Sequence, residues 1–197
     1  YKDTLIEEHI SGIPGDDFIK EFLPKCTESE KSQIAKEFVK FKERCLVRLL
    51  GDMRSYNYVI IPTHDFDKII YKIRAIDFDQ QSFEGNLKVY NLQFLKENFK
   101  IVEMVNRKLD NNSINQYKLE ERSFMAKRMI SSPRRASSLI ECMKNDSISF
   151  DNNIQLLKKQ LIKYVGDVKF KECQNMGDIL ETILVFVKRN YQDVLTK

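Results

Sequence analysis

Residues that commonly bind metal ions are scarce in this sequence of 197 residues. Its four cysteines are far apart and never form a C-x-x-C pair, so the sequence indicates neither a zinc knuckle nor a redox pair. They are Cys26, Cys45, Cys142 and Cys173. The two histidines, His9 and His64, are too few for a histidine-based metal centre. We therefore expect reduced thiols, as in the cytosol.

Long apolar stretches and an excess of one charge are also missing. No long apolar run occurs, and no short apolar segment follows a basic start, so we expect neither a membrane span nor a signal peptide. The 33 lysines and arginines face 29 acidic residues, a mixed balance of +4 that does not favour a nucleic-acid binder. We expect a cytoplasmic protein without a membrane partner. Because the net charge is small, an anionic ligand would need a specific local binding site.

Hydrophobic residues make up 42% of the chain, which is enough for a folded core. Their spacing predicts a strand over 4–10, a short helix over 16–23 and a long helix from Thr27 to Gly51. Isoleucine-rich and tyrosine-rich segments predict one β-hairpin within 57–78. Beyond Gly85 the pattern predicts only helices, over residues 92–109, 112–130, 133–144, 151–164 and 177–195. We therefore expect an α+β fold that is mostly α-helical and has one small hairpin.

Five polar residues gather around this predicted hairpin. Asp52, Arg54 and Asn57 lie in the loop before it, and Asp77 and Asp79 lie at the end of its second strand. An Asp five residues before an Asn is common by chance, but here a long helix precedes the loop and a strand pair follows it. Phosphoryl transfer needs such groups: oxygen ligands for Mg²⁺, a cation near the moving charge and a carboxylate beside the acceptor hydroxyl.

The region resembles the C-terminal lobe of the protein-kinase-like superfamily, which includes protein kinases and small-molecule kinases of the aminoglycoside-phosphotransferase type. The resemblance covers about residues 5–85. It implies that Asp52 is the catalytic carboxylate, that Arg54 lies near the transferred phosphate, and that Asn57 and Asp77 bind Mg²⁺. We therefore expect an ATP-dependent and Mg²⁺-dependent phosphotransferase whose substrate bears a hydroxyl group.

The same resemblance divides the chain into two parts. Residues 1–14 would be a hinge-like strand and linker, and residues 15–197 a helical kinase-like C-terminal lobe. Glu8 and Ile10 would pair with adenine through their backbone, and Val59 would be an apolar floor beneath the ring. No glycine-rich loop or strand lysine precedes them, so we expect the N-terminal lobe to be absent or supplied by another chain. This chain alone would then lack effective kinase activity.

Two departures from the family pattern bear on the substrate. Leu50-Gly51-Asp52 lacks the histidine of H-R-D, and Asp79 stands where protein kinases have the glycine of D-F-G. An acidic residue after I-D-F looks like the small-molecule kinases, and no A-P-E follows. A protein substrate is therefore not expected.

Two other functions fit the same residues. A pseudokinase-like module would keep the lobe as a binding scaffold without catalysis. A metal-dependent glycosyltransferase fragment would use Asp77 and Asp79 as a D-x-D pair, because side chains two apart on a strand share one face and reach one ion. That fold, however, requires several alternating strands and helices.

One further motif lies outside this region. Arg134-Arg135-Ala136-Ser137 resembles a site favoured by basophilic protein kinases. The simpler interpretation is a basic start to a surface helix.

Overall fold

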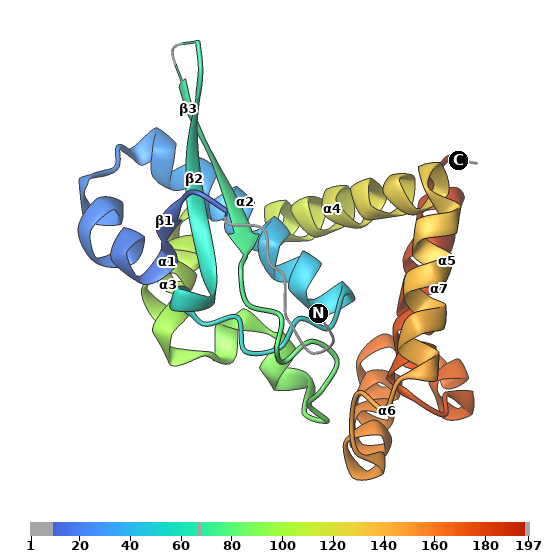
Figure 1. The fold of residues 1–197 in the computed structure, drawn as a ribbon. Coiled ribbons are helices and arrows are strands. Elements are labelled where there is room, and N and C mark those ends of the chain that lie inside the picture. Colours follow the sequence, from blue (N-terminus) through green and yellow to red (C-terminus); the bar gives the residue numbers. More distant parts are fainter. Residues whose placement is uncertain (1–9, 67, 196–197) are drawn as a thin grey trace.

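The computed structural model describes residues 10–66 and 68–195 of the chain (Figure 1). Three strands form one antiparallel sheet in the order β1 (Ile13–Pro14), β2 (Tyr58–Asp65) and β3 (Lys68–Ala75). The α-helices are α1 (Gly15–Asp17), α2 (Glu28–Val47), α3 (Phe99–Lys108), α4 (Asn111–Ser131), α5 (Pro133–Asn145), α6 (Asp151–Val165) and α7 (Met176–Leu195). The predicted α+β class, mostly helical, is confirmed. None of the described helices combines the length and the apolar character that crossing a membrane requires.

Helix α2 begins where the sequence predicts. The backbone N–H of Thr27 donates to Glu30 Oε2 at 2.7 Å, and the N–H of Glu30 donates to Thr27 Oγ1 at 3.3 Å. This reciprocal pair satisfies two N–H groups that a helix start otherwise leaves free. The helix ends just before Leu49, whose positive φ of 51° turns the chain toward the next loop.

The sheet is larger than the predicted hairpin. Strands β2 and β3 confirm the hairpin, with Tyr58 opposite Ala75 and Ile60 opposite Ile73. Strand β1 adds a third strand that the sequence analysis did not predict, with Ile13 opposite Ile60. The strand predicted over 4–10 lies outside the described residues except for Ile10, which is in no regular element.

The later helices match their predicted positions with one correction. The helix predicted over 92–109 begins only at Phe99, because residues 92–98 form short 3₁₀ turns, Leu92–Phe94 and Lys96–Asn98. Further 3₁₀ turns are Leu23–Lys25, Ser55–Asn57, Leu87–Tyr90 and Val168–Glu172, and Phe18–Phe22 is a turn of π-helix. The tighter turns before α3 place a buried Asn98 at its start.

Buried apolar side chains form two clusters. One lies between the sheet, α2 and α3, and includes Phe38, Phe41 and Tyr58. The other is formed mainly by α6 and α7 and includes Leu157 and Ile179. Figure 1 shows α4 as the long helix that runs from the sheet-containing half toward α5–α7.

Helix α4 is fixed to α2 by buried acidic groups. Arg122 Nε donates to Glu43 Oε1 at 2.5 Å. Glu121 Oε1 lies 3.2 Å from Arg44 Nη1, at ion-pair distance but not in hydrogen-bond geometry. Both glutamates are buried, so removing either arginine would leave a carboxylate without a partner in a poorly solvated position.

Candidate functional site

Asn57 fixes the conformation of the loop between α2 and β2. The carbonyl oxygen of Asp52 accepts the Nδ2 group of Asn57 at 2.8 Å and the backbone N–H of Arg54 at 2.7 Å. Asp52 has a positive φ of 52°, a conformation that aspartate and asparagine adopt more readily than most residues. Because its Nδ2 bonds to Asp52, the Oδ1 of Asn57 is the side-chain atom that can ligate a metal ion.

The chain that follows β3 runs beside this loop. Ile76 donates its backbone N–H to the carbonyl oxygen of Asn57 at 3.1 Å, one residue beyond the last strand pair. Farther on, Leu50 and Gln81 form an isolated bridge, and the N–H of Ser82 donates to Leu49 at 2.8 Å. These bonds hold residues 76–82 beside residues 49–57, which brings Asp77 to the same end of the sheet as Asp52 and Asn57.

One premise about the acidic pair is wrong. Strand β3 ends at Ala75, so Asp77 and Asp79 do not project from one strand face. Instead, the backbone N–H of Asp79 donates to Asp77 Oδ1 at 3.0 Å, which closes a short turn. The Asp79 side chain is exposed, and what this residue supplies here is the N–H that orients the Asp77 carboxylate.

Arg54 lies between two carboxylates. Its Nε donates to Asp52 Oδ1 at 2.6 Å, and its Nη1 donates to Glu97 Oε1 at 3.3 Å. The hydrogen bond that Arg54 donates to Asp52, aided by the charge of this carboxylate, raises the pKa of Arg54 above its ordinary value. Arg54 is 39% exposed, so a solvent-borne anion has access to it. Glu97 was missed by the sequence analysis, because nothing in the local sequence links it to a loop 43 residues earlier.

Asn98 anchors the loop from beneath. It is fully buried, and its Nδ2 donates to the carbonyl oxygens of Met53 at 3.0 Å and Leu92 at 3.3 Å. Its Oδ1 accepts the hydroxyl of Tyr58 at 3.0 Å. Burial raises the pKa of Tyr58, so the phenol stays a neutral donor. Nothing in the local sequence singles out Asn98 either, since Met53 and Tyr58 lie at least 40 positions earlier.

The predicted nucleotide-binding residues lie beside the sheet. Val59 is buried and pairs with Pro14 of β1. Gly12 lies directly against it, since a Cβ on Gly12 would approach Val59 Cβ to 2.9 Å. Ile10 is half-buried, and Glu8 lies outside the described residues. Val59 is therefore covered by the segment that leads into β1.

The donor set fits a magnesium ion that is shared with a ligand. Asn57 and Asp77 supply hard oxygen donors, which Mg²⁺ prefers. Within residues 10–66 and 68–195, no group of three or more His, Cys, Asp or Glu is arranged to hold a metal ion by itself. Mg²⁺ is usually held by one or two carboxylates together with water and substrate phosphates, so two protein donors are enough.

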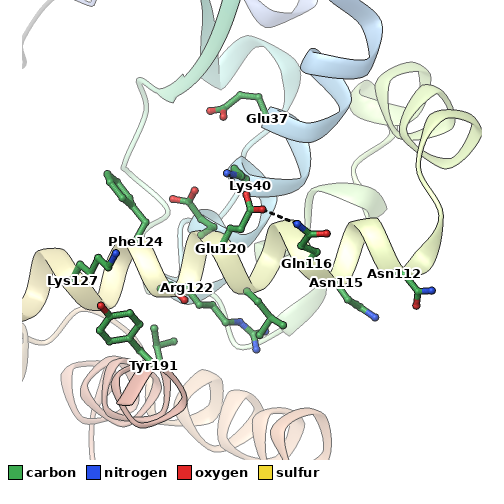
Figure 2. Close-up of a pocket in the computed structure, with 14 residues that line it drawn as sticks. Glu37, Lys40, Asn112, Asn115, Gln116, Glu120, Arg122, Phe124, Lys127 and Tyr191 are labelled. Atoms are coloured by element: carbon green, nitrogen blue, oxygen red, sulfur yellow. Dashed lines mark hydrogen bonds and ion pairs between the residues drawn. The ribbon is translucent and has the colours of Figure 1, made fainter. Parts of the chain in front are cut away.

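A separate concave surface lies along α4. Figure 2 shows this cavity of about 890 Å³, lined by side chains of α2, α4 and α7. Three of its polar groups bond to one another: Lys40 lies 2.7 Å from Glu120, which also accepts Gln116 Nε2 at 3.1 Å. None of the predicted site residues lines it.

Comparisons with known proteins give no match: no family model, no curated protein and no solved structure matches the chain.

Proposed function

We propose that the protein containing this chain transfers the γ-phosphoryl group of Mg²⁺-ATP to a hydroxyl group of its substrate. The observation that carries the proposal is the double attachment of Asn57. Its side chain bonds to the Asp52 carbonyl at 2.8 Å, and its backbone carbonyl accepts Ile76 at 3.1 Å. One residue therefore joins the backbone of the candidate base to the residue that precedes the candidate metal ligand Asp77.

Asp52 is proposed to accept or orient the proton of the attacking hydroxyl. Its carboxylate is 32% exposed, so an acceptor hydroxyl has access to it from solvent. Its positive φ gives the side chain a direction that differs from that of an ordinary loop residue. Such outliers persist only where the surroundings hold them, here through Asn57 and the Met53–Asn98 bond.

Arg54 is proposed to stabilise the negative charge that develops on the transferred group. Its two carboxylate partners hold the guanidinium at the edge of the loop. Glu97 keeps Arg54 in place when the side chain of Asp52 turns toward an acceptor. Because both ion pairs are partly exposed, exchanging one of them for a phosphate contact costs little.

Asn57 and Asp77 are proposed to hold the metal, with Asp79 orienting Asp77 through its backbone N–H. When bound, Mg²⁺ would neutralise charge on the phosphates of ATP. Ile10 is proposed to border the base of the nucleotide, whereas Val59 supports the segment that covers it. A scaffold without catalysis would keep the loop geometry but would not need a carboxylate at residue 52.

Mn²⁺ is a suitable probe for this proposal because it binds the same oxygen donors and broadens nearby NMR signals. With ATP present, Mn²⁺ should broaden the Asn57 side-chain amide and the backbone amides of residues 77–79. Asp77→Asn should weaken Mn²⁺ binding by at least about tenfold. Asp65→Asn, at the exposed hairpin tip, is the matched control and should bind normally. Equal affinity in all three proteins, or broadening confined to other residues, would refute the proposal.

A further inference from the structure

A sequence that basophilic protein kinases recognise lies at the start of α5, just after the corner where α4 ends (Figure 1). Arg134 and Arg135 precede Ser137 by three and two residues. Kinases of this class read arginines at these positions with carboxylates in their substrate groove, through charge-assisted hydrogen bonds.

The competing interpretation, a basic start to a surface helix, does not account for the two arginines. The N-terminus of a helix carries partial positive charge, so cations in its first turn destabilise the helix. The first turn of α5 holds no acidic residue that would offset them. Among the side chains that the structure describes, no carboxylate pairs with Arg134 or Arg135, whereas Lys144 at the other end of α5 pairs with Glu181 at 2.6 Å.

The recognition side chains are accessible. Arg134, Arg135 and Ser137 are all exposed, and Ala136 between them is half-buried. The only α5 residue that is fully buried among those described is Met143, well beyond the motif. The motif therefore contributes little to the packing of α5 on α7.

The start of α5 also has the features of a helix end that opens readily. Ser132 at the cap position makes no side-chain hydrogen bond to the first turn. An uncapped helix end leaves backbone N–H groups unsatisfied and is a preferred place for fraying. This matters because protein kinases bind their target segment in an extended conformation.

We propose that Ser137 is phosphorylated by a basophilic protein serine kinase. The Ser137 Oγ forms a bond to the γ-phosphorus of Mg²⁺-ATP held by that kinase, while the bond from this phosphorus to the β–γ bridging oxygen breaks. ADP leaves, and the hydroxyl proton passes to the carboxylate base of that kinase. The proposal is independent of the phosphotransferase activity proposed above.

The phosphate would change the electrostatics of the helix start. It carries a charge of about −1.5 to −2 near pH 7. Arg134 lies one helical turn before Ser137 and faces the same side, so the two groups pair, while Glu141 one turn later opposes this more weakly because the helix start favours the anion. Phosphorylation should therefore strengthen a helix end that the arginines weaken.

The test uses the purified chain, Mg²⁺-ATP and the catalytic subunit of cyclic-AMP-dependent protein kinase, with a sample lacking the kinase as blank. Mass spectrometry locates the phosphate, and a peptide of residues 130–142 gives the reference rate. We expect phosphate on Ser137, at a rate within about a hundredfold of the peptide's, because opening a frayed turn costs little. Ser137→Ala should abolish this incorporation and Ser138→Ala should keep it.

The arginines are tested by the double variant Arg134→Gln with Arg135→Gln, which keeps the side-chain length and should react at least about tenfold more slowly. Three results would overturn the proposal. They are a chain that reacts more than a hundredfold more slowly than the peptide, a phosphate placed mainly on Ser138 or elsewhere, and a double variant that reacts at the original rate.

Discussion

Asn98 donates a 3.0 Å hydrogen bond to the carbonyl oxygen of Met53, and this bond joins the start of α3 to the loop that holds Asp52. Asn98 is fully buried, so the three groups that it bonds have no alternative partner in water. The loop therefore keeps its shape because an amide lies beneath it, and not because its own sequence is rigid.

Asn98→Ala should destabilise the protein by about 2–4 kcal/mol. The substitution leaves two carbonyl oxygens and the hydroxyl of Tyr58 without partners, and burying unpaired polar groups is costly. Urea unfolding followed by circular dichroism measures the free energy. The matched control is Asn115→Ala on the exposed face of α4, which should change stability little because alanine favours helix. If the Asn98→Ala protein were as stable as this control, the hydrogen bonds of Asn98 would not contribute to stability.

Local signals in the sequence were sufficient for the helices and the hairpin. Thr27 and Glu30 are spaced as a capping box, and α2 begins there. Period-two alternation marks β3, where Tyr71 and Ile73 are buried and Lys72 and Arg74 are exposed. In both cases the residues that determine the element lie within it.

Non-local contacts explain what the sequence did not reveal. Strand β1 is two residues between Gly12 and Gly15, and it exists only because β2 lies beside it. The late start of α3 follows from the buried bonds of Asn98, whose partners lie far away in sequence. The roles of Asp52 and Asn57 are implied by the resemblance to a kinase-like lobe, whereas Glu97 reaches Arg54 only in the folded chain, from 43 positions later in the sequence.

In the intact protein, Asp52→Asn should leave Mg²⁺-ATP affinity nearly unchanged and should slow turnover by roughly 10²–10⁴-fold, the usual contribution of a positioned base. Asparagine tolerates the positive φ of residue 52, so the loop should keep its shape. Calorimetry gives the affinity, and single-turnover transfer to water gives a rate that needs no identified acceptor. Turnover equal to that of the parent protein would favour the scaffold function.

Gly15→Ala should destabilise the protein by about 2–4 kcal/mol because no space exists for a methyl group. A Cβ at this position would lie 2.7 Å from Tyr58 Cδ2 and would also overlap the carbonyl oxygen of Ser55, so α1 would move away from the loop. Gly166→Ala is the comparison variant, because it introduces backbone strain without a steric clash. Gly166 has a φ of 79° and open space around it, so it should lose only about 1–2 kcal/mol. Thermal or urea unfolding of both variants checks the order, and a larger loss at residue 166 would contradict it.

Lys42 is a half-buried cation whose hydrogen-bond partner is neutral. Its Nζ donates to Gln93 Oε1 at 2.7 Å, beside a cavity of about 350 Å³ that is bordered by Phe38 and Val105. Burial, together with the charge of Lys118, lowers the pKa of Lys42 from its ordinary value to about 8. The unfolded chain therefore binds one more proton than the folded chain between about pH 8 and pH 10.5.

Lys42→Met should stabilise the protein at pH 7 by about 1–3 kcal/mol, because it removes a partly desolvated charge and keeps the length of the side chain. Between about pH 8 and pH 10.5, Lys42 is neutral in the folded protein and protonated in the unfolded chain. Raising the pH through this window removes the proton that favours the unfolded chain, so the parent protein becomes more stable. The difference between variant and parent should therefore shrink across this window, in urea unfolding at several pH values. Lys163→Met on exposed α6 should show no such trend. A constant difference between variant and parent from pH 7 to pH 10.5 would mean that Lys42 titrates normally in the folded protein.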